Sequence, residues 1–310
     1  MNYDFFASNE NSPQKPFGYD EIISKMILLQ QESNFMPVNL FTAAEGTGKR
    51  KLCEYLIAHH LGQSLKPYSQ LNLHPDLLII SPDQNKKTNE ITIEQTRKIK
   101  NFTHLTAAQA AIKIILIDAL DNLNLNAANS ILKILEEPQQ NCFFYLICHN
   151  PNKILDTILS RTHKIILPKL SQKDFFAILA QHNIHDNQDI LYEIFPNKPG
   201  IALSFINNSG LELLQDIENI LTKKQHFAAN ILIEKYNFKN KPENFENILA
   251  CFNYLTYKNI KNNIKEARYI EELNDFINIF NHDFHLAKKL NLEKDIFIIN
   301  HINKLQKFYV

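Results

Sequence analysis

Apolar residues between positions 38 and 168 are grouped in short continuous runs rather than in alternating patterns. Runs of this kind, bounded by polar segments, are typical of strands that are covered on both faces in a parallel sheet. The runs are Val38–Ala43, Leu77–Ile80, Ile112–Asp118, Cys142–Cys148 and Lys164–Leu167. The pattern therefore predicts a parallel sheet built from these five segments.

Helical patterns lie between the runs. Thr92-Ile-Glu-Gln95 has the spacing of a capping box, in which two side chains bond the free N–H groups at a helix start. It predicts a helix over Thr92–Leu105. A further helix is predicted to begin after Asn126 as its cap and to end before Pro138. Strands and helices in this order indicate a doubly wound α/β domain.

The remainder of the chain has helical patterns only. Ser171 to Asp174 predicts a new helix start, and the segment Asn197-Lys-Pro-Gly200 interrupts the helical pattern. Beyond Gly210 the apolar residues recur with a period of about 3.6 and strand signals are absent. We therefore predict three domains: an α/β domain over residues 1–168, a small helical lid over residues 169–209, and an all-helical domain over residues 210–310.

Composition excludes several classes of protein. The 310 residues include 33 basic and 33 acidic side chains, so a global positive field that attracts polyanions is not expected. No apolar run approaches the length of a membrane span, and Met1–Pro16 lacks the apolar core of a signal peptide. The four Cys residues are too few for a disulfide framework in a chain of this size. These features predict a cytoplasmic protein with no membrane partner and with reduced thiols.

A glycine-rich turn follows the first predicted strand and precedes a predicted helix over Lys49–Leu61. It carries Gly46 and Gly48, two of only six glycines in the chain, followed directly by Lys49. Such a turn directs backbone N–H groups at phosphates, and the lysine adds a charge. However, Ala43 stands where the first glycine is required, and Arg50 stands where a Ser or Thr would ligate magnesium. The segment is a candidate nucleotide site with defects, or an ordinary strand–turn–helix corner.

Asp118 ends the third predicted strand, where a nucleotide hydrolase places the acid that holds magnesium. The next position, where a Glu would polarise the attacking water, is Ala119. Asp121 lies beyond the strand end and cannot simply replace that base. An Asp at a strand end is also a common capping residue. We therefore interpret Asp118, with Gly46, Gly48 and Lys49, as part of a vestigial nucleotide site.

Two segments then resemble a known family. Residues 118–138 (DALDNLNLNAANSILKILEEP) resemble the second acidic motif and following helix of AAA+ clamp-loader subunits. Residues 150–162 (NPNKILDTILSRT) resemble their sensor-1 segment and Ser-Arg-Cys motif, with Thr162 in place of the Cys. His74-Pro-Asp76 also fits this pattern. The chain is similar to the clamp-loader subunits of bacterial DNA polymerase III, in particular to those that do not hydrolyse ATP.

The resemblance implies an AAA+ P-loop domain, a lid, and a helical collar that joins subunits into a five-membered ring. It implies gamma/tau and delta subunits as partners, indirect contact with the sliding clamp, and weak contact with primer-template DNA through the complex. It also implies that Arg161 is an arginine finger for ATP on a neighbouring subunit. A purely structural alternative is an Arg placed favourably near a helix C-terminus.

The expected cofactor chemistry follows from the missing groups. Active relatives carry a sensor-2 arginine where this chain has Gly200. With the first glycine, the magnesium hydroxyl and the catalytic Glu also absent, we expect no hydrolysis and no required cofactor. ATP or ADP could still bind at the remaining loop residues. Two alternatives stay open: a gamma/tau-like AAA+ ATPase that itself binds and hydrolyses ATP, and a degenerate AAA+ module of another DNA transaction.

Other candidate sites favour structural roles. The four-Cys zinc module of many clamp-loader subunits would fall between Gly62 and Leu77, which contain no Cys, so zinc is not expected. We predict buried roles for Cys53, Cys142 and Cys148, and solvated roles for the pairs Lys86-Lys87, Lys223-Lys224 and Lys288-Lys289. Helix-packing and oligomer-interface roles are expected for the C-terminal aromatic residues Phe245, Phe252, Tyr254, Tyr257, Phe276, Phe280 and Phe284.

Overall fold

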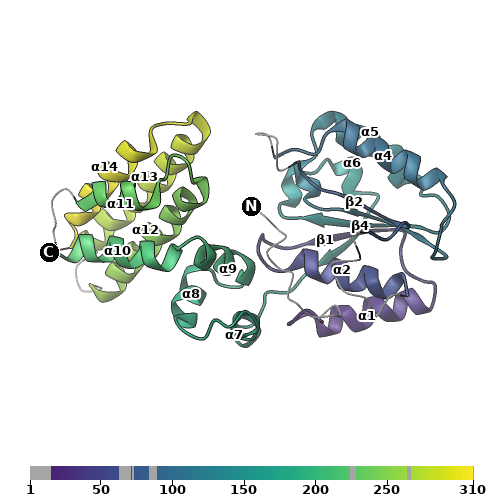
Figure 1. Ribbon diagram of the computed structural model, residues 1–310, viewed down its shortest axis with the longest axis horizontal. Coiled ribbons are helices and arrows are strands. Elements are labelled where there is room, and N and C mark those ends of the chain that lie inside the picture. The colour runs from purple at the N-terminus through teal and green to yellow at the C-terminus, as the bar shows by residue number, and fades with distance from the viewer. Residues whose placement is uncertain are drawn as a thin grey trace. The chain divides into compact units, whose positions relative to one another are not determined.

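The computed structural model describes residues 15–62, 71, 73–83, 89–223, 228–263 and 267–309. The chain forms two compact units (Figure 1). The first comprises Met1–His185 with Asn197–Gly200, and the second comprises Asp186–Pro196 with Ile201–Val310. The segment predicted as a lid, residues 169–209, is thus divided between the two units.

The first unit is built on a parallel sheet with the order β2-β3-β4-β1-β5. Its strands are β1 (Val38–Thr42), β2 (Leu77–Ile80), β3 (Lys113–Ile117), β4 (Cys142–Cys148) and β5 (His163–Ile166). These strands confirm the sequence prediction to within one residue at each end. Because all five are parallel, the segments that follow β1, β3 and β4 meet at one edge of the sheet.

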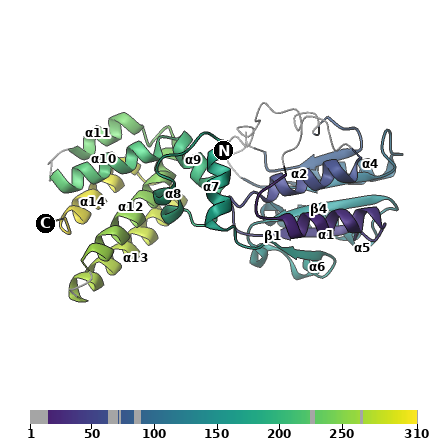
Figure 2. The ribbon, with the colours of Figure 1, turned by 90° about the horizontal axis from the view of Figure 1, so that it is seen from below.

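Helices cover both faces of this sheet (Figures 1 and 2). The helices α1 (Asp20–Gln31) and α2 (Lys49–His60) cover one face. The helices α4 (Ile93–His104), α5 (Leu125–Glu136) and α6 (Asp156–Leu159) cover the other. The unit also contains α7 (Gln172–Gln181) and two short 3-10 turns, Leu120–Asn122 and Pro151–Lys153.

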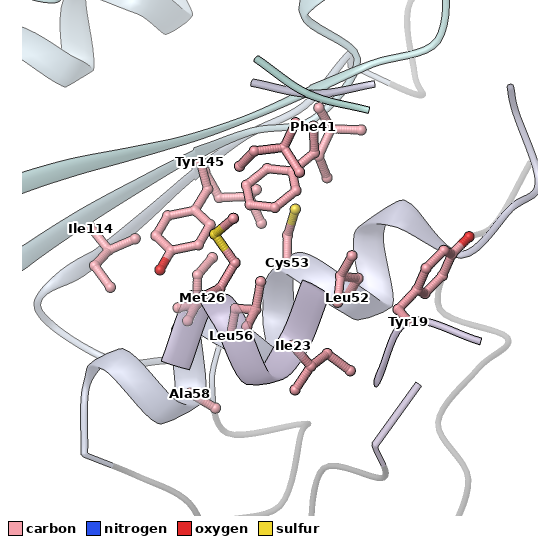
Figure 3. Packing of buried hydrophobic residues seen from close by; sticks show 14 of the residues in the cluster. Tyr19, Ile23, Met26, Phe41, Leu52, Cys53, Leu56, Ala58, Ile114 and Tyr145 are labelled. Atoms are coloured by element: carbon pink, nitrogen blue, oxygen red, sulfur yellow. The ribbon is translucent and has the colours of Figure 1, made fainter. Parts of the chain in front are cut away.

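The two faces have separate cores, as the continuous apolar runs predict. Figure 3 shows Phe41 and Tyr145 of the sheet packed with Met26, Cys53 and Leu56 of α1 and α2. Their chain neighbours on the strands point to the opposite core, which also takes both remaining Cys residues of this unit, Cys142 and Cys148. All four cysteines are free and buried, which confirms the buried roles predicted for Cys53, Cys142 and Cys148.

Local capping signals were correct at two of the three predicted helix starts. The capping box of Thr92 and Gln95 is present at α4, and the Ser171 hydroxyl accepts from the Asp174 N–H at 3.1 Å to start α7. The prediction that Asn126 caps α5 was wrong. Asn124 is the cap, and its side chain accepts from the Ala127 N–H at 2.9 Å. Both are Asn residues in a segment where Asn and Leu alternate, and only the chain direction after the 3-10 turn decides between them.

The described part of the second unit is entirely helical beyond Gly210, as predicted. It contains α8 (Gln188–Ile194), α9 (Pro199–Asn207, which begins in the first unit), α10 (Gly210–Lys223), α11 (Ala228–Tyr236), α12 (Pro242–Asn262), α13 (Ala267–Leu290) and α14 (Lys294–Gln306). Its core is aromatic: Phe252 stacks on Phe280 with ring centroids 4.6 Å apart, and Phe245 stacks on Phe284 at 4.7 Å. Tyr257 differs from the other predicted packing residues, because 59% of it is exposed.

Candidate nucleotide site and surface arginine

The turn between β1 and α2 has the backbone of a phosphate-binding loop. Gly46 and Gly48 have φ values of 79° and 87°, in the left-handed region that favours glycine. Gly48 is the N-cap of α2, so no side chain caps this helix end. The two clustered glycines are therefore required by the turn itself, whether or not a ligand binds there.

Lys49 is directed into the loop. It is buried, and its Nζ donates to the carbonyls of Ala43 and Ala44 at 2.9 Å and 2.6 Å. Burial lowers the pKa of the Lys49 ammonium group to about 8, against the opposing effect of nearby acids. In this arrangement the lysine satisfies the loop's own carbonyl groups rather than projecting towards a phosphate.

Two further groups donate hydrogen bonds to the loop carbonyls of Thr47 and Gly46. The buried Tyr19 hydroxyl donates to the Thr47 carbonyl at 2.7 Å, and the Gly200 N–H donates to the Gly46 carbonyl at 2.8 Å. A Cβ atom at Gly200 would lie 3.0 Å from the Gly46 oxygen. Gly200, which the resemblance aligns with a sensor-2 arginine, thus meets the loop through its backbone. The sequence gives no signal for the role of Tyr19.

Arg50 forms an ion pair with Asp118. Its Nη1 lies 2.8 Å from the Asp118 Oδ2, and its Nε also pairs with Glu54 on the same helix. Burial lowers the pKa of the Arg50 guanidinium, but Glu54 and Asp118 outweigh this effect, so that the pKa is raised. The structure thus brings Asp118 together with the P-loop helix, as the sequence predicts, but through an arginine.

The residues present do not fit a magnesium-bound nucleotide. The side chain at the hydroxyl position carries a positive charge that repels the ion, and the carboxylate that would hold it is already paired. Among the described residues, no group of three or more His, Cys, Asp or Glu side chains is arranged to hold a metal ion. The site therefore offers a fixed internal cation in place of a magnesium position.

The acid beyond the strand end has a structural partner. Asp121 accepts from the backbone N–H groups of His149 and Asn150 at 3.0 Å and 3.1 Å, and so joins the end of β3 to the end of β4. Ala119, at the position of the catalytic Glu, has a φ of 60° and is buried. Asp121 thus fixes the start of the segment that follows β4.

A second buried acid has a comparable role that sequence reasoning did not predict. Asp76, in the His-Pro-Asp segment, accepts from the backbone N–H groups of Ala108, Gln109 and Ala110 at 2.6–2.7 Å. Burial by itself raises the pKa of Asp76. The three hydrogen bonds together lower the pKa by more than burial raises it, so the pKa lies below its ordinary value. The carboxylate fixes the turn that leads into β3.

Arg161 lies apart from these residues, just after α6. Its Nη1 donates to the Thr157 carbonyl at 2.6 Å, and its Nη2 pairs with Glu136 of α5 at 3.1 Å. The side chain is 29% exposed. None of its hydrogen-bond partners belongs to the P-loop, so its guanidinium is held at a surface away from its own loop.

Comparisons with known proteins agree with the sequence motifs. A family model described as "DNA polymerase III, delta subunit" matches residues 19–171. The DNA polymerase III subunit delta' of Pseudomonas aeruginosa is 27% identical over 202 residues, 63% of this chain and 56% of that protein. The subunit delta' of Buchnera aphidicola subsp. Baizongia pistaciae is 30% identical over 62% of this chain and 52% of that protein. This chain is a relative of the DNA polymerase III delta-prime subunits.

The matches cover only part of the delta-prime relatives. The alignments span about half the length of the delta-prime relatives, 56% and 52% in the two cases above. The DNA polymerase III subunit gamma of the same Buchnera is 25% identical over 96% of this chain and 80% of its own. Both delta-prime and gamma subunits of DNA polymerase III are therefore relatives of this chain.

A solved structure extends the fold assignment to nearly the whole chain. A DNA polymerase III, gamma subunit-related protein from Thermotoga maritima superposes with a TM-score of 0.55 and 18% identity. The match covers 92% of this chain and 99% of that protein. The shared fold is an α/β domain with a parallel sheet followed by helical segments, which confirms the predicted fold class.

Several predictions are not tested by these observations. Lys86, Lys87 and Lys224 lie outside the described residues, as does most of Met1–Pro16. The zinc, nucleotide and DNA predictions also stay predictions. None of the helices in the described part of the chain combines the length and apolar character that a membrane crossing requires.

Proposed function

We propose that this chain is a non-hydrolysing stator subunit of a DNA polymerase III clamp loader, which helps to place the sliding clamp on primed DNA. Its partners in this role are gamma/tau and delta subunits, in a ring of five. Contact with the clamp is indirect, and contact with primer-template DNA is weak and made through the complex. Relatives named as delta-prime and gamma subunits support membership of that complex.

The observation that carries the proposal is the ion pair between Arg50 and Asp118. Hydrolysis of a nucleotide requires a cation held by the Asp at the end of β3 and a base next to it. Here the Asp is neutralised within the chain and the base position is Ala119. Loss of a general base alone costs about 10²–10⁴ in rate. These losses support a subunit that does not turn over ATP.

We place the chemical contribution of this chain at Arg161. A guanidinium that meets the phosphates of ATP on a neighbouring subunit spreads their charge in the transition state, an effect of about 10³–10⁵ in rate. The partly exposed position of Arg161, bonded to α5 and α6 rather than to its own loop, supports this role.

The first experiment measures ATP binding and hydrolysis by the purified chain, with and without magnesium. We expect no magnesium-dependent turnover. Magnesium-dependent turnover that Lys49→Ala abolishes would overturn the proposal and make the chain a gamma/tau-like ATPase.

The second experiment tests the arginine in a complex reconstituted with gamma/tau and delta subunits. We expect Arg161→Ala to lower ATP hydrolysis at the site that faces this chain by about 10³-fold or more. Single-turnover measurements detect this as the loss of one site's amplitude. Arg97→Ala, an exposed arginine on α4, is the matched control. Equal amplitudes in the Arg161 variant and the wild type would remove the finger from the proposal.

A further inference from the structure

The guanidinium of Arg161 is bonded at both ends. Nη1 donates to the Thr157 carbonyl at 2.6 Å and, more weakly, to the Ser160 hydroxyl at 3.4 Å. Nη2 donates to Glu136 Oε1 at 3.1 Å. Glu136 is the one charged group among these partners and the one that belongs to another helix, the C-terminal end of α5. It therefore connects the arginine to the helix that packs beside α6.

The hydrogen bonds of Arg161 within the chain use only some of its N–H groups. An arginine has five N–H donors in a planar fork. Those of Nη1 are directed at Thr157 and Ser160, and one of Nη2 is directed at Glu136. Nε is buried and has no hydrogen-bond partner among the described residues. The second N–H of Nη2 is therefore the donor that can be offered without breaking one of these bonds.

Burial separates Arg161 from an ordinary surface arginine. Arg268, which pairs with Glu272 one turn along its own helix, is 91% exposed, whereas Arg161 is 29% exposed. The Nε of Arg161 is buried, and hydrogen bonds from Nη1 and Nη2 orient its guanidinium. A long side chain that is held in this way loses less freedom when it meets a phosphate, so more of the interaction is available to the transition state.

We propose that Glu136 is a positioning residue for Arg161. This inference rests on the proposed function of Arg161 as an arginine finger. Glu136 accepts from one N–H of Nη2 and leaves the other without a partner among the described residues, while Thr157 fixes Nη1. The carboxylate acts through the arginine and not on the partner's nucleotide. Glu136 supplies a hydrogen-bond acceptor for Arg161 Nη2, and the amide oxygen of a Gln at this position can supply one too.

The test uses substitutions that separate the acceptor from the rest of the side chain. Glu136→Ala removes the acceptor, and we expect hydrolysis at the facing site to fall by about 10- to 100-fold, since displacement of a catalytic group by about 1 Å can cost 10²-fold. Glu136→Gln keeps an acceptor oxygen at the same reach, and we expect most of the activity to be retained. Glu137→Ala is the matched control, because this exposed neighbour is not among the described hydrogen-bond and ion-pair partners of Arg161.

Single-turnover ATP hydrolysis is measured in the reconstituted complex, normalised to assembled complex by size-exclusion chromatography. The double variant Arg161→Ala/Glu136→Ala should be no slower than Arg161→Ala alone, because Glu136 acts through the arginine. A further loss in the double variant would overturn the inference. So would a wild-type rate for Glu136→Ala beside a slow Arg161→Ala, a result that leaves the finger itself intact. An unaffected Arg161→Ala would instead overturn the finger.

Discussion

Arg50 Nη1 lies 2.8 Å from Asp118 Oδ2, so the first turn of the P-loop helix is bonded directly to the end of β3. In a nucleotide hydrolase these two elements are bridged through magnesium and its ligands. Here a guanidinium makes the bridge, with a carboxylate that is only 13% exposed. A site assembled in this way needs no ligand to hold its two halves together.

Removal of this bridge should destabilise the first unit. We expect Arg50→Ser to lower the free energy of unfolding by about 1–3 kcal/mol, because it leaves the Asp118 carboxylate without its charged partner. Urea denaturation measures the change, with the exposed Arg97→Ala as control. Magnesium should raise the melting temperature of Arg50→Ser and leave that of the wild type unchanged. An equal magnesium response in both proteins would contradict the interpretation of Arg50 as an internal cation.

The depressed pKa of Lys49 predicts a pH dependence of stability. The pKa is about 8 in the folded chain and 10.5 in the unfolded chain, so between these values the unfolded state binds more protons. Stability should therefore rise with pH across this window, by about 3 kcal/mol relative to Lys49→Met. Urea denaturation of both proteins from pH 7.5 to 10.5 gives the difference. A difference that is constant with pH would show that the ammonium group is not buried as described.

Asp76 should contribute to stability at neutral pH and lose that contribution in acid. Its folded pKa lies below the ordinary value of 3.8, so its contribution is present above 3.8 and is lost as the pH falls through the folded pKa. We expect Asp76→Asn to cost about 1–3 kcal/mol at pH 7, since three backbone N–H groups lose a charged acceptor.

Thermal unfolding of wild type and Asp76→Asn at pH 7 and at pH 3 measures that loss. The gap between the two proteins should narrow at the lower pH. The exposed Glu90→Gln serves as control, and a gap that widens in acid would contradict the assignment.

The aromatic core of the second unit should be sensitive to truncation. Phe280 is fully buried and stacks on Phe252 with ring centroids 4.6 Å apart. We expect Phe280→Ala to cost about 3–5 kcal/mol, because it removes apolar burial and leaves a cavity. Tyr257→Ala, at a position that is 59% exposed, should stay within about 0.5 kcal/mol. Calorimetry measures the loss of stability in both variants. Similar losses for Phe280→Ala and Tyr257→Ala would show that Phe280 does not lie in the core.

The pattern of apolar residues predicted the strands and helices well, because the positions that are buried in the fold are apolar. The strands β1, β3 and β4 are buried along almost their whole length, so their residues are apolar without alternation. The strand β5 at the edge of the sheet is largely exposed, yet all five runs were identified to within one residue at each end. The helix cap was less certain, because Asn124 and Asn126 have the same chemistry and only the path of the preceding turn selects one of them.

The sequence by itself determined the α/β fold class, the absence of the hydroxyl and base from the loop, and the resemblance of its motifs to a known family. The fold class follows from the pattern of apolar residues and the missing groups follow from residue identity, because both are local properties of the chain. Only the tertiary structure decided that Arg50 pairs with Asp118, that Gly200 meets Gly46, and that Glu136 holds Arg161. In each pair the partners are between 25 and 154 positions apart, and only folding brings residues so distant in the chain within hydrogen-bond reach.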